Sequence, residues 1–421
     1  MKSNKVGLNI VGYTDATSGL AEAVRSNIYA AVKSKIPLNI INYEKVKHNT
    51  NYKYSYEYSI NLVQISLNDL DRFFSVIEPD FFNDRYCILC LVWESEHIPS
   101  NLKKTINLFN EIWTPSTYVK ELLQNAYNGP IIVVPHPVEV NLKPIESQKI
   151  QNFFDNNKFS FLFIFSYHSS IERKNPFFLI EAFSKAFSDN DDVELVIKTS
   201  GAEKYKQSER SLHQFAATKN NIKIFNVDLD KNSVSHLIND SDCYVSMHHS
   251  EGFGLTLAEA MSLGKPTVAT NYSGNTEFMN ENNSFLVDFE LGAIVNPDIN
   301  FSSKTIWANP LLHDAINKLK EVYENKVVRG QKATNAKLYV KEKLSFDTVG
   351  SIMKDRLNYI YNNLEDLSIN DRRQAYLLNQ LQQAKSEIAQ LQREIRRMKK
   401  NVVIKSVLVI KDSVRTLKGN K

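Results

Sequence analysis

Two successive series of short apolar runs, each alternating with amphipathic segments, constrain the fold of this chain more than any other feature. In the first series, the runs VGLNIVGY, PLNIIN and YCILCLVWE are separated by longer segments such as LAEAVRSNIYAAVKSK. Short apolar runs predict buried strands, whereas the longer segments have the spacing of a helix with one apolar face. Strands that are apolar on both faces and alternate with helices are typical of a parallel sheet covered on both sides.

The second series begins after a polar stretch at residues 141–158. Its apolar runs are FSFLFIFSY, VELVIKTS, NIKIFNV, DCYVSM and PTVATNY, and helices are predicted between them. We therefore predict an α/β protein with two doubly wound, Rossmann-like domains, at residues 1–155 and 156–345, that face each other across a cleft. Because ligands bind at the carboxyl ends of parallel strands, we expect the functional site in that cleft.

The length and composition agree with two folded domains. The chain has 421 residues, of which 43% are apolar and 23% charged, which excludes a single small module and a disordered protein. Its apolar runs are too short to cross a bilayer, and the first residues lack the features of a signal peptide. Three cysteines cannot form a disulfide framework. We therefore expect a cytoplasmic protein.

The net charge of +4 is unevenly distributed along the chain. Residues 371–421 contain 13 lysines and arginines but only 4 aspartates and glutamates, so this segment has a net charge of +9 and the rest of the chain has −5. A nucleic-acid-binding protein needs excess positive charge on its folded body. The charge distribution therefore argues against a nucleic-acid partner.

Apolar residues near the C-terminus recur at alternate spacings of four and three, which predicts a coiled coil over residues 371–400. They are Leu377, Leu381, Ala384, Ile388, Leu391, Ile395 and Met398. Through this segment we expect a homo-oligomer or a complex with a partner protein. The alternative is a single amphipathic helix that packs on the body of the protein.

The last segment, residues 401–421, is predicted to form a basic amphipathic helix. Its apolar face consists of Val403, Val407, Ile410, Val414 and Leu417. Such a helix can lie on an anionic membrane surface, which would place the protein at the inner face of the plasma membrane. The alternatives are a continuation of the coiled coil and a β-prone tail.

The segment SMHHSEGFGLTLAEAMSLG, residues 246–264, has the features of an anion-binding loop. A predicted strand is followed by two glycines, and a helix is predicted to begin at Thr256. Glycine lets the backbone approach a ligand closely, and the amides at a helix start favour negative charge. We therefore expect a diphosphate group to bind here, at Gly252, Phe253, Gly254, Leu255 and Thr256.

Two glutamates flank this loop, with Glu251 before the glycines and Glu259 in the predicted helix. Eight residues of helix rise about 12 Å, which is close to the length of a nucleotide sugar from hexose to ribose. The two carboxylates are therefore placed to hold the two ends of such a molecule. Alternatively, Thr256 and Glu259 form a capping box, in which Glu259 only satisfies the backbone at the helix start.

The run from Glu251 through Gly-Phe-Gly-Leu to Glu259-Ala-Met-Ser-Leu-Gly resembles the EX7E signature of the retaining glycosyltransferases of family four. The resemblance covers about residues 5–365 and implies the GT-B fold, with residues 346–370 returning as a helix to the N-terminal domain. In that family the first glutamate, here Glu251, faces the transferred sugar. The second, here Glu259, binds the ribose of the nucleotide.

Two further segments fit this resemblance. Family members place basic residues against the donor diphosphate after the first strand of the second domain, which implies this role for Arg173 and Lys174. Many members carry an arginine directly after that strand, where this chain has Ser166-Tyr-His168. The loop that contains Gly19 resembles the one that closes over the donor. The alternatives are a solvated Arg-Lys pair at a helix start and a tight turn at Gly19.

The segments WESEHIP, EIWTPS and VPHPV resemble a subgroup of the family that acts in bacterial surface-polysaccharide assembly. Glu94 and His97 lie at a predicted strand end and are candidate acceptor contacts, or else polar loop residues. The resemblance implies transfer that needs no metal and no resident cofactor. His248 and His249 lack further metal ligands at a suitable spacing.

The sequence therefore predicts a retaining glycosyltransferase in the biosynthesis of a surface polysaccharide such as lipopolysaccharide. Glu251, Lys174 and Arg173 would carry the transfer of a hexose such as mannose from a nucleoside-diphosphate sugar to a glycan acceptor. The resemblance implies displacement on one face of the sugar, with the diphosphate helping to deprotonate the acceptor. The alternatives are a nucleotide-sugar epimerase on the same fold and a non-catalytic scaffold that recruits partners to a membrane through the coiled coil.

Overall fold

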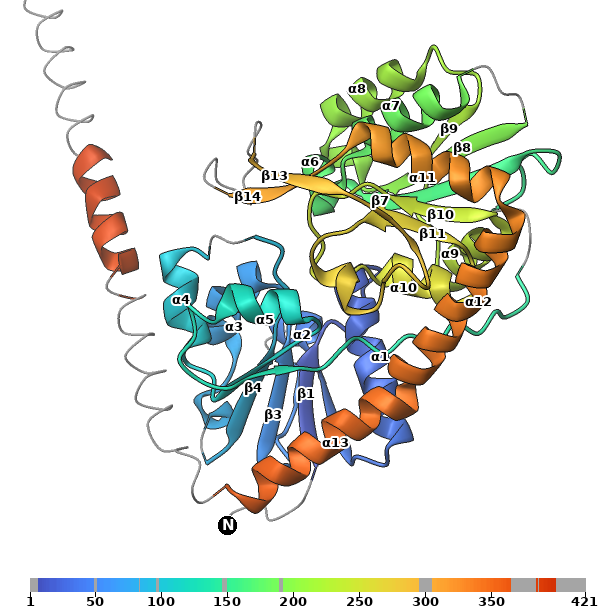
Figure 1. The fold of residues 1–421 in the computed structure, drawn as a ribbon. Coiled ribbons are helices and arrows are strands. Elements are labelled where there is room, and N and C mark those ends of the chain that lie inside the picture. The colour runs from blue at the N-terminus through green and yellow to red at the C-terminus, as the bar shows by residue number, and fades with distance from the viewer. Residues whose placement is uncertain are drawn as a thin grey trace, which may run out of the picture.

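The computed structural model shows two α/β domains, one above the other in Figure 1. Each contains a parallel sheet of six strands within the part of the chain that the structure describes. This confirms the predicted fold class. The described residues are 7–48, 51–82, 84–95, 98–145, 150–188, 192–294, 305–364, 384 and 386–398.

The sheet of the first domain has the strand order β2-β1-β3-β4-β5-β6, so the direction of winding reverses between β1 and β3. Its strands are β1 (Leu8–Gly12), β2 (Leu38–Asn42), β3 (Ile60–Gln64), β4 (Tyr86–Cys90), β5 (Glu111–Thr114) and β6 (Ile131–Val133). Its helices are α1 (Gly19–Lys33), α2 (Tyr43–His48), α3 (Leu70–Val76), α4 (Ser100–Ile106) and α5 (Thr117–Leu123). Neighbouring residues such as Ile88 and Leu89 belong to separate apolar cores on the two faces, which explains the continuous apolar runs.

The sheet of the second domain has the order β12-β11-β10-β7-β8-β9, and its winding reverses between β7 and β10. The strands are β7 (Phe159–Ser166), β8 (Val193–Ser200), β9 (Ile222–Asn226), β10 (Cys243–Ser246), β11 (Thr267–Thr270) and β12 (Phe285–Val287). The helices are α6 (Ile171–Lys174), α7 (Pro176–Phe187), α8 (Lys206–Ala216), α9 (Lys231–Asp240) and α10 (Leu255–Ser262). A hairpin of β13 (Phe289–Ala293) and β14 (Ile306–Pro310) follows.

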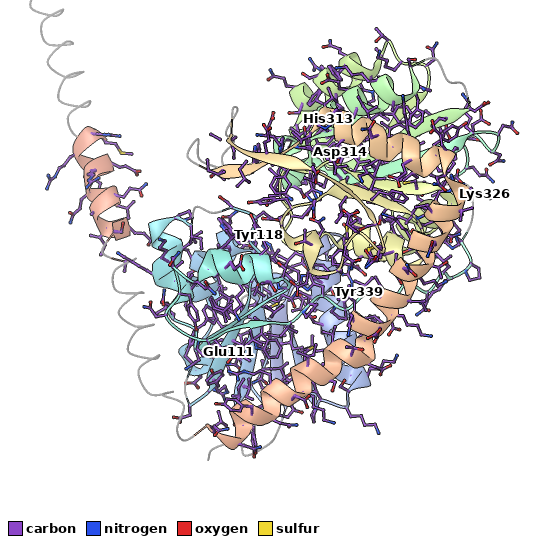
Figure 2. All side chains as sticks on the ribbon, viewed as in Figure 1. Glu111, Tyr118, His313, Asp314, Lys326 and Tyr339 are labelled. Carbon is purple, nitrogen blue, oxygen red and sulfur yellow. The ribbon has the colours of Figure 1, made fainter. Side chains whose placement is uncertain are left out.

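Three helices follow the second domain in the chain and lead from the second sheet back to the first domain (Figure 1). They are α11 (Leu312–Glu324), α12 (Lys326–Lys343) and α13 (Phe346–Asn362). Helix α13 packs against α1, where a side chain on Gly350 would come within 2.3 Å of the Ala30 carbonyl oxygen. Arg356 of α13 also donates to Glu111, a fully buried carboxylate of the first domain that Figure 2 labels. The last described helix of the body therefore belongs to the first domain.

The chain crosses between the domains at two adjacent points. The backbone amide of Val138 donates to the carbonyl of Leu344 at 2.6 Å, and the amide of Phe346 donates to Glu139 at 2.9 Å. Val138 and Phe153 both pack in an apolar core of the second domain. The first crossing therefore lies near Val138, ahead of the expected boundary at residue 155, because Val138 and Phe153 already belong to the core of the second domain.

The described part of the predicted coiled coil is helical at residues 386–398. Its heptad residues are at least half exposed to solvent: Ile388, Leu391, Ile395 and Met398. This exposure does not fit the alternative of a helix buried against the body. Residues 401–421 lie outside the described residues. None of the helices that the structure describes has the length and hydropathy needed to cross a membrane.

Candidate functional site

The candidate site lies where the winding of the second sheet reverses. Strands β7 and β10 are neighbours there, and the segments that follow them turn to opposite faces of the sheet. Such a switch point leaves a crevice at the carboxyl ends of the strands. The segment after β7 carries Arg173 and Lys174, and the segment after β10 carries Glu251. The fold thus brings together three residues that the sequence analysis singled out.

The three side chains form a buried ionic cluster. Arg173 Nη1 lies 3.2 Å from Glu251 Oε2, and Lys174 Nζ contacts the other carboxylate oxygen of Glu251. Arg173 Nη1 also donates to the carbonyl oxygen of Ser250 at 2.7 Å. Only 5% of Arg173 and 8% of Glu251 is exposed. The alternative of a solvated Arg-Lys pair is therefore wrong.

A single helical turn directs the two cations toward β10. Helix α6 begins after Ser170 and ends before Asn175, both of which have positive φ angles, of 64° and 54°. The Ser170 side chain accepts a hydrogen bond from the backbone amide of Arg173, and the side-chain amide of Asn175 donates to the carbonyl of Met247 at 3.0 Å. Residues other than glycine keep such a backbone conformation only where the surrounding structure holds them. The turn therefore fixes the cations against the segment after β10.

Glu251 is ionised at neutral pH. Burial alone would raise the pKa of Glu251, but the adjacent Lys174 and Arg173 outweigh it and lower the pKa to about 2. Burial lowers the pKa of Lys174, and Glu251 opposes that shift. Arg173 also lies 3.6 Å from Glu94, which comes from the first domain. The two cations thus hold one carboxylate from each domain, and they are suited to bind an anionic ligand in place of these carboxylates.

The glycines of the loop before α10 permit close packing between backbone segments. Gly254 caps α10 with a φ of 91°, and a side chain on Gly252 would lie 2.2 Å from Val92 of the first domain. A side chain on Gly274 would lie 2.2 Å from the Gly252 carbonyl oxygen. Phe253 is buried against His136. Helix α10 begins at Leu255, one residue before the predicted start at Thr256.

Glu259 is held by a lysine that the sequence analysis did not identify. Its carboxylate pairs with Lys231, the first residue of α9. Because Gly254 caps α10 and Thr256 lies within its first turn, the capping-box alternative for Thr256 and Glu259 is wrong. The Asp230 N-cap after a predicted strand could have placed Lys231 at a helix start, but only the fold places it beside Glu259.

The two histidines before Glu251 position the loop. His248 Nε2 lies 2.9 Å from Asn275 Oδ1, and the ring of His249 stacks on Trp307 with the ring centres 4.2 Å apart. Among the described residues, no group of three or more His, Cys, Asp or Glu side chains is arranged to hold a metal ion.

These histidines make the stability depend on pH. Burial lowers the pKa of His136, His248 and His249 from the usual 6.5 to about 4 in the folded protein. As the pH falls from about 6.5 to 4, the unfolded chain therefore binds protons that the folded protein does not. We expect the free energy of unfolding to fall by about 1.4 kcal/mol per pH unit for each histidine in this range.

Urea unfolding at pH 7, 6 and 5 measures this dependence. His136→Gln should reduce the slope, whereas His313→Gln should leave it unchanged, since His313 is exposed on the second domain (Figure 2). Equal slopes in the wild type and in His136→Gln would contradict the expectation.

The remaining predicted residues lie in the first domain. Glu94 follows β4, and its carbonyl accepts a hydrogen bond of 2.8 Å from Ser250. Gly19 begins α1 after the Ser18 cap, its φ is not positive, and a side chain there would meet no atom within 4 Å. The tight-turn alternative for Gly19 is therefore wrong. His97 lies outside the described residues.

The first domain contacts the loops of the site through residues 116–118, which the sequence analysis did not identify as functional. Ser116 donates to the Gly252 carbonyl at 2.9 Å, and the amide of Thr117 donates to Glu277 at 2.7 Å. The hydroxyl groups of Tyr118 and Ser250 are 3.2 Å apart. Figure 2 shows Tyr118 on the side of the first domain that faces the second. These contacts close the two domains around the ionic cluster.

Comparisons with known proteins agree with this arrangement. Residues 147–295 match the family model of the glycosyl transferases group 1. No curated protein sequence matches the chain.

Several solved structures are similar over both domains. HepE of Anabaena, in complex with UDP and glucose, has a TM-score of 0.61 and 14% identity over 84% of this chain and 100% of its own. Sucrose-phosphate synthase of Thermosynechococcus elongatus has a TM-score of 0.64 and 11% identity over 85% and 100%. A glycosyltransferase of Rickettsia africae has a TM-score of 0.60 and 18% identity over 85% and 100%. At these identities the likeness shows the fold, which is GT-B.

Proposed function

We propose that this chain, which carries a domain of the glycosyl transferases group 1, is a retaining glycosyltransferase that uses a nucleoside-diphosphate sugar. It transfers a hexose to a glycan acceptor in the biosynthesis of a surface polysaccharide. The observation that carries the proposal is the buried cluster of Arg173, Lys174 and Glu251 at the switch point of the second sheet. Complexes of HepE with UDP-glucose and of the fold neighbour TarM of S. aureus with UDP and α-GlcNAc-glycerol support a sugar nucleotide and a glycan acceptor.

In the proposed complex, the diphosphate binds Arg173 and Lys174. Arginine donates two parallel hydrogen bonds to phosphate oxygens, and lysine adds a point charge. Glu251 then holds hydroxyl groups of the transferred sugar, and Glu259 holds the ribose. Because Lys231 neutralises Glu259 in the free protein, a ribose hydroxyl joins or replaces Lys231 at that carboxylate.

The proposed reaction proceeds on one face of the sugar. The bond between the anomeric carbon and the diphosphate oxygen breaks, and a bond to the acceptor oxygen forms on the same side. The acceptor proton passes to a phosphate oxygen of the leaving group. Arg173 and Lys174 stabilise the negative charge that develops on the diphosphate, and a preorganised buried site makes this stabilisation large.

The first domain binds the acceptor in this proposal. Glu94 contacts Arg173 in the free protein, so the donor diphosphate competes with Glu94 for that cation. Once displaced, the Glu94 carboxylate is available to accept a hydrogen bond from an acceptor hydroxyl. Closure through residues 116–118 excludes water and orients the substrates.

Donor turnover tests the proposed function. The purified protein is incubated with UDP-, GDP- and ADP-hexoses and with lipid-linked or oligosaccharide acceptors, and nucleotide release and glycan products are measured. We expect release of a nucleoside diphosphate that depends on the acceptor, and a product with retained anomeric configuration. Conversion of the donor to an isomer without acceptor would favour an epimerase. If the protein neither bound nor consumed any donor, both the glycosyltransferase and the epimerase would be ruled out.

Glu259→Ala is expected to weaken the binding of nucleoside diphosphates at least about tenfold, because a carboxylate acceptor for the ribose is lost. Titration calorimetry with UDP and GDP measures this affinity. Glu181→Ala is the matched control, since the Glu181 side chain on α7 is partly exposed and forms its ion pair with Lys185, within the same helix. Unchanged nucleotide affinity in Glu259→Ala would exclude the ribose role.

The C-terminal segment is proposed to join copies of this chain. A coiled coil over residues 371–400 is supported by the exposed apolar residues Ile388, Leu391, Ile395 and Met398. Contact of the tail with an anionic membrane at the cytoplasmic face is supported by the net positive charge of residues 371–421. Light scattering and cosedimentation with anionic vesicles, each with and without residues 371–421, test the two roles. If the protein is an enzyme, it should keep its turnover in solution after this deletion. If it is a non-catalytic scaffold, it should lose its function.

A further inference from the structure

Lys198 is a buried cation that has no role in the reaction described above. It lies in β8, where its register partners are Ile164 of β7 and Phe225 of β9. Register partners in a parallel sheet point to the same face, so Lys198 shares the face of these two apolar side chains. Both belong to the apolar group between the sheet and helices α9 and α10. Only 5% of Lys198 is exposed.

The ammonium group of Lys198 makes no hydrogen bond or ion pair with any residue that the structure describes. Burial lowers the pKa of Lys198, and the charge of the more distant Asp228 partly opposes that shift. Lys198 Nζ is not one of the fully buried polar atoms without a partner, so it keeps some contact with solvent at a place where its charge has no ion pair among the described residues. A lysine retained in this environment is therefore expected to gain a hydrogen-bond acceptor when a ligand binds.

Lys198 and Glu259 each interact with a charge on the segment from Asp228 to Lys231. Lys198 is the third residue from the carboxyl end of β8, and Asp228, whose charge acts on it, follows the carboxyl end of β9. The same segment continues to Lys231, the partner of Glu259. The carboxyl edge of β8 and β9 is therefore continuous with the proposed ribose site.

The strand order gives the direction in which a bound nucleotide extends. The two cations proposed to hold the diphosphate follow β7, and β8 and β9 lie next in the sheet on the side away from β10. A nucleotide with its diphosphate on Arg173 and its ribose near Glu259 then places its base over the ends of β8 and β9. Lys198 is the buried cation at that position.

We propose that Lys198 selects the nucleobase of the donor by donating a hydrogen bond to a carbonyl oxygen of the base. This inference rests on the proposed function, because it requires the nucleotide to occupy the site described above. Lysine has three donors and no acceptor, so it fits O4 of uracil or O6 of guanine, at the positions where cytosine and adenine carry amino groups. The exocyclic amines of cytosine and adenine, which are donors themselves, would face the cation without a partner. A site with such a buried donor rejects a ligand that lacks the matching acceptor.

The experiment measures the dissociation constants of UDP, GDP, CDP and ADP by titration calorimetry for the full chain and for Lys198→Met. The wild type is expected to bind UDP or GDP at least about tenfold more tightly than CDP and ADP, which is the effect of one hydrogen bond to a charged group. Lys198→Met should lose that preference, with the affinities for CDP and ADP changed less than about threefold. Lys185→Met, on the exposed side of α7, should keep it.

Thermal unfolding without ligand separates this role from a structural one. Replacing an unpaired buried cation with an apolar side chain of similar length should leave the melting temperature unchanged or raise it. A lower melting temperature together with equal weakening of all four nucleotides would show that Lys198 is structural and overturn the inference. An unchanged preference in Lys198→Met would also overturn it. If the wild type bound none of the four nucleotides, the proposed function itself would fail.

Discussion

Replacing Arg173 with alanine should lower kcat by about a thousandfold. Arg173 is buried at the switch point and pairs with both Glu251 and Glu94. In the proposed transition state it faces the diphosphate oxygens, where negative charge develops as the bond to the sugar breaks. The effect should fall mainly on kcat, because this charge is greater in the transition state than in the bound donor. Steady-state kinetics with the preferred donor and acceptor measure it.

Two variants control for loss of structure. Arg173→Lys keeps the charge without the two parallel donors, and we expect an intermediate kcat. Arg210→Ala removes an exposed arginine from α8 of the same domain and should leave kcat unchanged. Circular dichroism and the melting temperature establish that each variant folds. Full turnover in a folded Arg173→Ala protein would rule out Arg173 as the residue that stabilises the leaving group.

Gly274→Ala should lower kcat/KM at least about a hundredfold, because a small displacement of reacting groups has effects of this size. The new side chain would lie 2.2 Å from the Gly252 carbonyl oxygen, which is backbone and has no other rotamer. The amide of Gly274 donates to the Glu251 carbonyl at 2.8 Å, so the same displacement moves Glu251. It also disturbs the contact between Gly252 and Ser116 of the first domain. Donor turnover at a range of donor concentrations gives kcat/KM.

Gly330→Ala is the matched control for this substitution. Gly330 lies in α12, and a side chain there would meet no atom within 4 Å. Alanine favours a helix over glycine, so this variant should be as active as the wild type and slightly more stable. If Gly274→Ala kept full kcat/KM, the close approach of the two loops would not be needed for activity.

The sequence predicted the fold class well because local patterns carry that information. Ile88 and Leu89 are neighbours that face separate cores, and such continuous apolar runs are found in strands covered on both faces. The glycines and glutamates at residues 251–259 likewise marked a loop between a strand and a helix. Helix α10 then began within one residue of its predicted start, because the cap at Gly254 depends on local conformation.

The partners of the site residues could not be predicted in this way. Lys231 and Glu259 are 28 positions apart, and Arg173 and Glu251 are 78 positions apart, so no local pattern relates them. Glu259 was equally compatible with a capping box, and only the position of Lys231 in the fold decided against it. The domain crossing near Val138 was also missed, because a polar segment gives no signal of the sheet that it covers.

Apolar periodicity, turn residues and the motif at residues 246–264 by themselves determined two Rossmann-like domains and the loop that carries the candidate site, since each depends on neighbours along the chain. The tertiary structure alone decided which charges meet: Arg173 and Lys174 with Glu251, Glu94 with Arg173, and an unpaired Lys198 beside β9. Ionic contacts and burial depend on which distant strands become neighbours in the sheet. That order is set by the packing of the whole domain.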